Sequence, residues 1–293
     1  MVRFQTIRWS TAASLVSCAL LLLGGQDSRE SQAGASQNSP DSVLVRVSVT
    51  DPLNRYVADL EQKDFKLQED RAVQNITYFA HKSAPISIGI IYEDAGRIEF
   101  IRDAIARSLR AGGQRGEFFL ISFSAKAARI EDFNTQGSIV QDSAAFGKVA
   151  GLSPLDEAIV IGLERMKKQT NVKKALVLVS EARHTLASYT SWTGKNPDVQ
   201  VYAIGRMGRL SAGPESIVAA SSGNAYQLDT MNEVEYYISL IYAELQNQYV
   251  LGYSPSNHKH DGKWRKISVE VNPPAGLPKL TVKAQKGYYA PEK

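Results

Sequence analysis

Residues 86–93 read ISIGIIYE, and this stretch decides the fold. It is almost continuously apolar, and three later stretches share that character: FFLISFS at 118–124, ALVLVSE at 175–181 and VQVYAIG at 199–205. Strands that are apolar on both faces suit a parallel sheet covered by helices on its two sides. The four stretches therefore predict the centre of an α/β sheet.

Helical patterns lie between these strands. Apolar residues recur at helical spacing in residues 97–110, after Ser153 and over residues 214–221, and a last helix begins at Thr230. The alternation of strands and helices over residues 86–246 predicts an open, doubly wound, mostly parallel α/β sheet.

Two of the predicted helices carry start signals. Ser153 is placed as an N-cap, with Pro154 at the first helical position and Asp156 three residues after the cap. Thr230 is followed three residues later by Glu233, which completes a capping box.

Strand-like segments flank the α/β region on both sides. They are SVLVRVSVTD (42–51), FKLQED (65–70), VQNITYFA (73–80), QYVLGYSP (248–255), KWRKISVEVN (263–272) and KLTVKAQKGYY (279–289). Each half is too small to bury its own apolar face. We therefore expect the N- and C-terminal strands to pair in one β-sandwich, with the α/β domain inserted into it.

The N-terminus predicts the compartment. Residues 1–25 combine Arg3 and Arg8 with an apolar run from Ala12 to Leu23, which is the layout of a secretory signal peptide. An uncleaved membrane anchor is the alternative. We expect an extracytoplasmic protein that is secreted, periplasmic or associated with the cell envelope.

Cys18 is the only cysteine of the chain. The tetrapeptide Leu15-Val16-Ser17-Cys18 resembles a bacterial lipobox, so Cys18 is a candidate for lipidation. Because the apolar core continues past it, an ordinary residue within the signal peptide is the alternative. Contact with a membrane is expected only through the signal anchor or this lipid.

These patterns divide the chain into five predicted segments. They are a signal peptide (1–25), a flexible linker (26–41), N-terminal β-strands (42–84), an α/β domain (85–246) and C-terminal β-strands (247–293).

Composition excludes some classes of protein. With 43% hydrophobic and 22% charged residues, the chain of 293 residues is an ordinary globular mixture rather than a disordered or fibrous protein. The formal net charge is +4, and without Arg3 and Arg8 the 32 basic residues exceed the 30 acidic ones by only two. We therefore expect no nucleic-acid partner.

An ordered set of motifs carries a family resemblance. The set is VSVTDPLNRYVADLEQKDFKLQED, ISIGIIYEDAG, GEFFLISFS, LSPLDEAIVIGLERMKK, KKALVLVSEARH, VQVYAIG, QNQYVLGYSPSNHKHDGKWRKISVEV and QKGYYA. Together these motifs resemble the von Willebrand factor type A (VWA) fold, and more closely the VWFA-related proteins of Acidobacteria. The resemblance covers nearly all of residues 42–290.

The resemblance implies a position for a metal-ion-dependent adhesion site. Its pattern is Asp-x-Ser-x-Ser after the first strand, a Thr from a second loop and an Asp from a third, and these fall at Glu93, Ala95, Arg97, Ser153 and Glu181. Ala95 offers no oxygen, and Arg97 places a permanent cation where a ligand should be. We therefore expect a degenerate site and no cofactor. The alternative is a remodelled site in which Glu93, Ser153 and Glu181 hold Mg²⁺ or another divalent cation.

The resemblance implies protein binding rather than catalysis. We expect a non-enzymatic adhesion-type module whose unidentified protein partner contacts the loops of the altered site. The residues of these loops are Glu93, Asp94, Ala95, Arg97, Ser153, Glu181 and His184. One alternative is a structural scaffold that interacts through its β-sandwich and carries an inert VWA-like domain.

The side chain of Arg97 has two interpretations. It could replace the ion by pairing with Glu93 or Glu181, because a guanidinium matches carboxylates, or it could point into solvent at the start of a helix.

Other polar residues carry weaker signals. His258-Lys259-His260 is better interpreted as a solvated turn than as a metal site, and Tyr288 and Tyr289 as packing residues. A hydrolase with Ser180 as nucleophile and His184, beside Glu181, as base is not favoured, because the sequence supplies no nucleophile elbow. No strand is followed by a phosphate-binding glycine loop.

Overall fold

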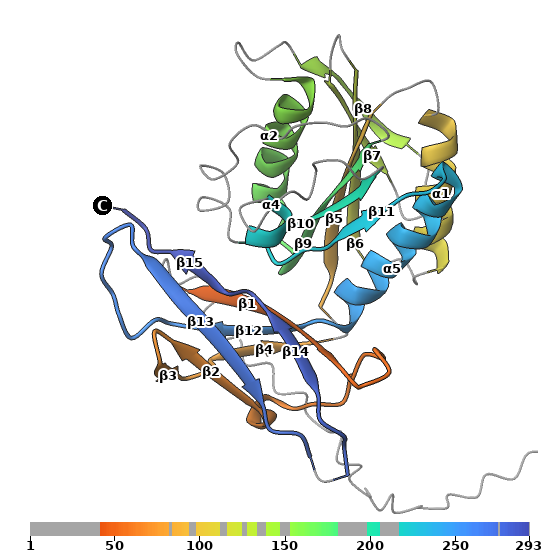
Figure 1. Ribbon diagram of the computed structural model, residues 1–293. Helices are drawn as coiled ribbons and strands as arrows, with labels where there is room; N and C mark the ends of the chain where they lie inside the picture. The colour runs from red at the N-terminus through yellow and green to blue at the C-terminus, as the bar shows by residue number, and fades with distance from the viewer. Residues whose placement is uncertain are drawn as a thin grey trace, which may run out of the picture. The chain divides into compact units, whose positions relative to one another are not determined.

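The computed structural model describes ten stretches of the chain (Figure 1). They are residues 42–81, 84–93, 98–111, 116–124, 128–133, 139–146, 153–180, 198–205, 217–274 and 276–292. All of them belong to one compact unit, Gly34–Lys293. The predicted signal peptide with Cys18 and the predicted linker lie outside the described residues, and the boundaries of the five segments stay predictions.

A seven-stranded sheet holds the apolar stretches. Its strand order is β11 (Ala225–Gln227), β10 (Val199–Gly205), β9 (Lys173–Ser180), β5 (Ile86–Glu93), β6 (Gly116–Phe123), β7 (Ala128–Phe133) and β8 (Ile139–Phe146). The first five strands are parallel, which confirms the α/β class. The antiparallel strands β7 and β8 and the short β11 were not predicted.

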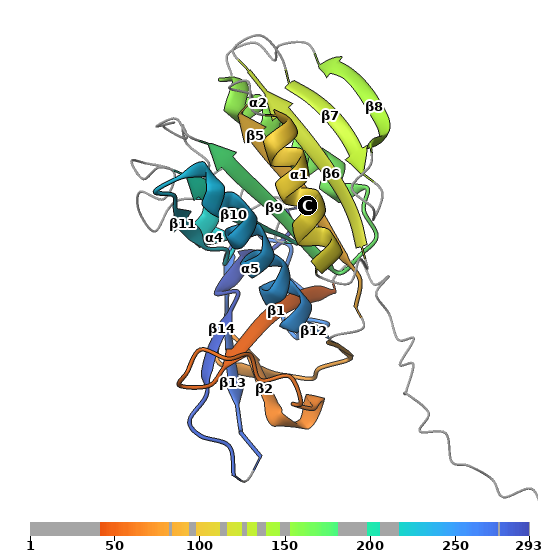
Figure 2. The same cartoon turned by 90° about the vertical axis from the view of Figure 1, so that its right-hand side faces the viewer.

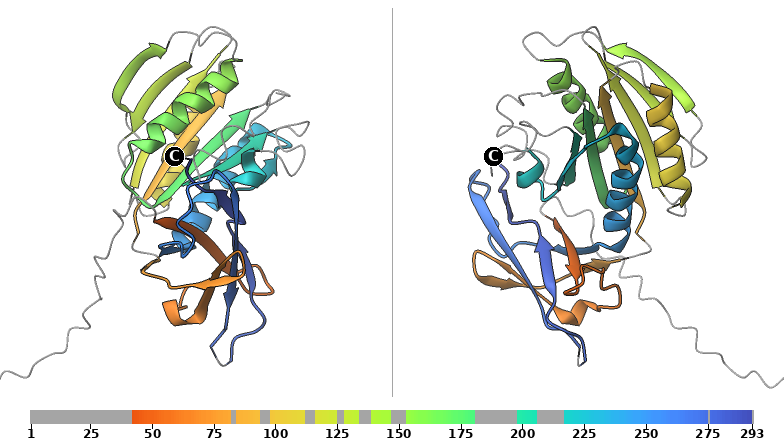
Figure 3. Two further views of the ribbon diagram at one scale, coloured as in Figure 1. Left: turned by 90° about the vertical axis from the view of Figure 1, so that its left-hand side faces the viewer. Right: turned by 45° about the vertical axis from the view of Figure 1, so that its right-hand side comes forward.

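Helices cover both faces of this sheet, as the two views of Figure 3 show. α1 (Ile98–Ala111) and α5 (Val234–Asn247) pack on one face, and α2 (Pro154–Lys167) and α4 (Ile217–Ala220) on the other. Figure 2 shows α1 and α5 side by side. Alternate residues of β5 enter the two cores, because neighbouring side chains of a strand point to opposite faces. Ile90 belongs to the core under α1 and α5, and Ile91 to the core under α2.

Two four-stranded sheets contain the flanking strands. One has the order β14 (Thr281–Ala284), β1 (Val43–Thr50), β12 (Tyr249–Tyr253) and β4 (Tyr78–Ala80). The other has the order β15 (Gly287–Tyr289), β13 (Trp264–Val271), β2 (Phe65–Glu69) and β3 (Ala72–Gln74). The antiparallel pairs β1–β12 and β2–β13 join the N-terminal strands to the C-terminal ones. Residues of both sheets, among them Val47 and Leu67, share one apolar core.

Two stretches expected as single strands are divided between these sheets. Residues 73–80 contribute β3 and β4, with the buried Ile76 between them, and residues 279–289 contribute β14 and β15. Gly287 permits the second division, because a Cβ at this position would collide with the indole of Trp264 on β13. The point at which the chain passes from one sheet to the other is not marked by the alternation of apolar and polar residues. The sequence therefore predicted one strand in each case.

The helix starts agree with the capping signals. Short 3₁₀ turns, Gln62–Asp64 and Met231–Glu233, precede β2 and α5. The carboxylate of Glu233 accepts hydrogen bonds from the backbone N–H of Asp229 at 2.9 Å and of Thr230 at 3.5 Å. The predicted helix over residues 214–221 is described only as α4, because residues 214–216 lie outside the described part.

A buried lysine joins the β-strand segments to the parallel sheet. Lys173, the first residue of β9, is 0% exposed. Its Nζ donates to the carbonyl oxygens of His81 and Gln246, both at 3.1 Å. His81 lies before β5, where the chain enters the seven-stranded sheet, and Gln246 lies before β12, where it returns to the flanking strands. The ammonium of Lys173 is therefore hydrogen-bonded to both connections. Burial lowers the pKa of Lys173 to about 8.

Candidate functional site

The carboxyl ends of β5 and β9 lie side by side. The two strands are parallel neighbours, paired from Ile86 with Lys173 to Tyr92 with Val179. Their last residues are Glu93 and Ser180. The hydroxyl of Ser180 donates a hydrogen bond of 2.7 Å to Oε2 of Glu93. A carboxylate and a hydroxyl from different strands therefore meet at this edge of the sheet.

This edge is where the strand order reverses. From β5 the chain adds β6 on one side of the sheet, and later β9 and β10 on the other. The helix after β5, α1, packs on one face, whereas α4, which follows β10, packs on the opposite face. In open α/β sheets the crevice at such a reversal is the usual ligand site. The Glu93–Ser180 pair thus lies where the topology favours binding.

Ser153 caps α2 and its hydroxyl is already engaged. Its Oγ accepts a hydrogen bond from the backbone N–H of Asp156 at 3.2 Å and donates to the carboxylate of Asp156 at 2.7 Å. The backbone N–H of Ser153 in turn points to the same carboxylate at 3.3 Å. The predicted capping role is confirmed, with Pro154 at the start of the helix.

The structure describes two of the seven predicted partner-binding residues, Glu93 and Ser153. The other five lie outside the described residues, namely Asp94, Ala95, Arg97, Glu181 and His184. Ser180 was considered only as a nucleophile, and its contact with Glu93 was not predicted. Aligning the carboxyl ends of two neighbouring parallel strands is the signal that could have found it.

Two kinds of feature are absent from the described part of the chain. Its residues contain no group of three or more His, Cys, Asp or Glu side chains that could hold a metal ion. None of its helices is both long enough and apolar enough to cross a membrane.

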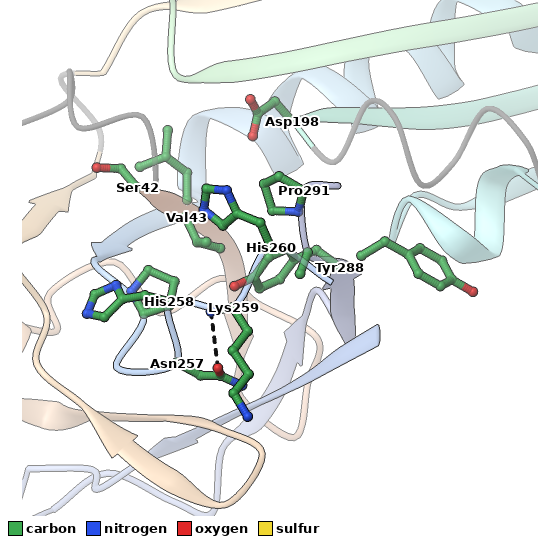
Figure 4. Close-up of a pocket in the computed structure, with 13 residues that line it drawn as sticks. Ser42, Val43, Asp198, Asn257, His258, Lys259, His260, Tyr288 and Pro291 are labelled. Carbon is green, nitrogen blue, oxygen red and sulfur yellow. Dashed lines mark hydrogen bonds between the residues drawn. The ribbon is translucent and has the colours of Figure 1, made fainter. Parts of the chain in front are cut away.

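A second polar feature lies among the β-strands (Figure 4). His258, Lys259 and His260 are exposed, as expected of a solvated turn, but they also line a cavity of about 190 Å³. Its lining also includes Val43 and Tyr288. No sequence pattern indicates this cavity, because its lining comes from segments far apart in the chain.

The two tyrosines near the C-terminus differ in role. Tyr288 is buried, and its hydroxyl donates to Oε2 of Glu69 at 2.9 Å, as does that of Tyr253 at 2.6 Å. Burial raises the pKa of both tyrosines. Tyr289 was expected to pack but is 50% exposed, with its ring edge-on to Trp264 at 5.0 Å between centroids. This correction follows from the register of β15, which turns Tyr289 to the outer face of its sheet.

Comparisons with known proteins give structural similarities alone. No family model matches the sequence, and a search of curated proteins finds no significant match. BatB, a conserved hypothetical protein from Bacteroides thetaiotaomicron, is 13% identical over 55% of this chain and 98% of its own, with a TM-score of 0.38. The ArnB paralog VWA2 from Sulfolobus acidocaldarius is 13% identical over 84% of this chain and 76% of its own, with a TM-score of 0.40.

A third similar structure comes from a different setting. Proximal thread matrix protein 1 from the mussel byssus is 12% identical over 71% of this chain and 50% of its own, with a TM-score of 0.38. Identities and TM-scores this low say nothing about activity. The α/β class therefore rests on the strand order and register of this chain.

Proposed function

We propose that the chain is a VWA-like, non-enzymatic protein-binding module that acts outside the cytoplasm. Its partner would contact the carboxyl edge of the parallel sheet, formed by Glu93, Ser153 and the loops that follow β5 and β9. The family assignment is part of the proposal. It is supported by the motifs of residues 42–290 and by the strand order, in which the parallel strand β6 and then the antiparallel pairs β6–β7 and β7–β8 follow on one side of β5.

The hydrogen bond between Ser180 and Glu93 carries the proposal. Through this bond the hydroxyl of Ser180 donates to Glu93, the acidic side chain that the structure describes at the strand-order reversal. A carboxylate with such a donor does not depend on a cation for compensation, because hydrogen bonding to the charged form stabilises it. Glu93 also remains partly exposed, so a partner can reach it.

Metal independence follows from the residue types in this proposal. Ala95 and Arg97 replace two positions that supply hydroxyl ligands in an adhesion site, and the hydroxyl of Ser153 is engaged with Asp156. The remaining candidate oxygens are those of Glu93 and Glu181, whereas Mg²⁺ requires six oxygen ligands in an octahedron. Arg97 would replace the ion by pairing with Glu93 or Glu181 at the carboxyl edge of the sheet.

Two further parts of the proposal concern architecture and location. The apolar core shared by the two four-stranded sheets supports a β-sandwich that holds the α/β domain as an insertion. The basic start and apolar run of residues 1–25 support export, with Cys18 as the candidate lipid attachment point.

Partner capture by the immobilised full chain tests the function. We expect capture of a protein from an envelope fraction to persist in EDTA and to fail for Arg97→Ala and His184→Ala. Ser268→Ala, a change at an exposed position of β13, is the matched control and should leave capture unchanged. If both loop variants capture normally while changes in β13 to β15 abolish capture, the protein is a scaffold that binds through its β-strands.

A further inference from the structure

Among the described residues, the first half of β1 pairs with a strand on one side only. β12 pairs with β1 over Val43–Val47, whereas β14 pairs with it only over Val47–Thr50. After Ala284 the chain leaves β1, and β15 pairs with β13 of the other sheet instead. The two sheets therefore separate beside residues 43–46, and the space between them has β1 on one side and β15 on the other.

The backbone of Leu44 points into this space. Residues of an antiparallel strand direct their N–H and C=O alternately to the two sides. The carbonyl of Val49 accepts a hydrogen bond from the N–H of Val57, which lies on the side of β1 away from β14. The backbone N–H and C=O groups of the odd-numbered residues of β1 therefore point toward β12. Gly252, the partner of Leu44 in the register, directs its carbonyl to Thr77 next to β4. Leu44 and Gly252 thus form a non-hydrogen-bonded pair, and the peptide groups of Leu44 face the edge.

A cavity occupies the same space (Figure 4). It has a volume of about 190 Å³ and lies between Val43 and Leu44 of β1 and the segment from Tyr288 to Pro291. Apolar and aromatic side chains form these walls. A pocket next to an open strand edge is the arrangement that binds an added strand, with backbone hydrogen bonds for affinity and a pocket for one side chain.

The cavity lining contains one lysine and two histidines. His258, Lys259 and His260 lie along one rim. The acid on the opposite rim, Asp198, has its carboxylate 3.8 Å from the guanidinium of the buried Arg46. Lys174 also interacts with Asp198, so two cations offset this acid and the charge of Lys259 favours an acidic ligand.

We propose that an extended, acidic segment of a partner protein adds to the edge of β1 at Leu44 and places one apolar side chain in the cavity. This surface is separate from the carboxyl edge of the parallel sheet, so the inference does not depend on the function proposed above. Edge strands are also commonly protected by prolines and lysines. If Pro255, Pro291 and Lys259 only protect the edge in this way, no peptide binds there.

Fluorescence anisotropy with the full chain and a labelled seven-residue peptide of alternating valine and glutamate tests the proposal. We expect saturable binding, at least about tenfold tighter than for a valine and lysine peptide of the same length. Hydrogen exchange should slow at the Leu44 amide when the peptide is added. A peptide with a central proline should not bind, because it cannot complete the strand.

Two pairs of variants separate backbone pairing from a general surface effect. Leu44→Pro removes the edge donor and should abolish binding, whereas Leu44→Ala keeps the donor and should lower affinity less than about tenfold. Lys259→Glu, at the cavity, should weaken binding at least about tenfold. Lys263→Glu, an exposed lysine outside the cavity lining, should not.

Three outcomes would overturn the proposal. They are equal binding of acidic and basic peptides, equal affinities of the Lys259→Glu and Lys263→Glu variants, and a Leu44 amide that is already protected without peptide. The last would mean that the edge is occupied by the chain itself. Because the lysine pair does not alter β1, the test remains decisive if Leu44→Pro fails to fold.

Discussion

Two glutamates, each bound by hydroxyl groups, occupy different environments in this protein. Glu69 is 2% exposed and accepts hydrogen bonds from Tyr253 and Tyr288 between the two four-stranded sheets. Glu93 is partly exposed at the end of β5 and accepts one from Ser180. A carboxylate that accepts hydrogen bonds from hydroxyl groups stabilises the fold where it is buried. Where it is partly exposed, the same kind of group remains available for binding.

The difference teaches how to separate a structural polar group from a functional one. Removing a buried carboxyl group with two hydroxyl donors takes away the acceptor of both, and at least one donor is left unpaired. A partly exposed one can exchange its partner for water or for a ligand. Stability should therefore depend on Glu69 and binding on Glu93.

The largest expected effect is the loss of stability in Glu69→Ala. Two buried tyrosine hydroxyls lose their acceptor, at a cost of about 4 kcal/mol in the free energy of unfolding. Glu69→Gln keeps an acceptor and should lose less than half as much. Glu93→Ala should lose less than about 1 kcal/mol. Urea denaturation measures all three, and equal losses for Glu69→Ala and Glu93→Ala would remove the contrast.

The pH dependence of Lys173 extends the comparison to a buried base. Its pKa is about 8 in the folded chain and 10.5 as the ordinary value, so the unfolded chain binds more protons between these pH values. Stability should therefore rise with pH in this window, by about 3 kcal/mol for the full difference. Above pH 10, buried tyrosines such as Tyr253 act in the opposite direction, because their raised pKa values keep the folded chain protonated.

Urea denaturation between pH 7 and pH 9.5 checks this contribution. Lys173→Met should lose the rise in stability with pH. Lys174→Met changes the next residue of the same strand and is the matched control. Burial lowers the pKa of Lys174 too, but Asp198 opposes the shift, so most of the rise should remain in this variant. Identical pH profiles for Lys173→Met and the unmodified protein would contradict the assignment.

A smaller effect is expected at the cap of α2. Ser153→Ala removes both the acceptor for the N–H of Asp156 and the donor to its carboxylate, and should lower stability by about 1 kcal/mol. Ser153→Thr keeps the hydroxyl and should retain most of that stability. A thermal melt of the two variants checks the prediction, which fails if both melt alike.

The smallest expected effect is that of Arg97→Ala. If Arg97 pairs with Glu93 or Glu181 at the surface, its removal should lower stability by about 0.5 kcal/mol, as for other exposed ion pairs. Arg97→Lys should restore part of this loss. An unchanged melting temperature would favour the interpretation in which Arg97 points into solvent.

The sequence predicted elements that are buried on both faces better than those that are not. The apolar stretches such as ISIGIIYE predicted the central parallel strands, and the capping residues predicted the starts of α2 and α5. β7 and β8 read ARIEDF and IVQDSAAF, and neither is apolar enough to be distinguished from a loop. In residues 279–289, the pairing of β15 with β13 brings Gly287 close to Arg265 and Trp264, and no local sequence pattern contains this approach.

The same distinction applies to the two candidate sites. Glu93 was predicted, because it ends an apolar strand at a position that the family motif also marks. Its partner Ser180 lies 87 residues away in the chain, and only the parallel register of β5 and β9 brings them together. The cavity beside Leu44 depends on where β14 leaves β1, which the sequence shows as continuous strand.

A calorimetric and thermal-shift titration of the protein with Mg²⁺, Mn²⁺ and Ca²⁺ tests the central claim most directly. An ion present at a concentration 100 times its dissociation constant would add about 2.7 kcal/mol to the free energy of unfolding. A site in which Ser180 already satisfies Glu93 and Arg97 replaces the ion should give no saturable heat and no shift with any of the three. A saturable shift that disappears in Glu93→Ala and Ser153→Ala would contradict the account and establish cation-dependent adhesion at this edge.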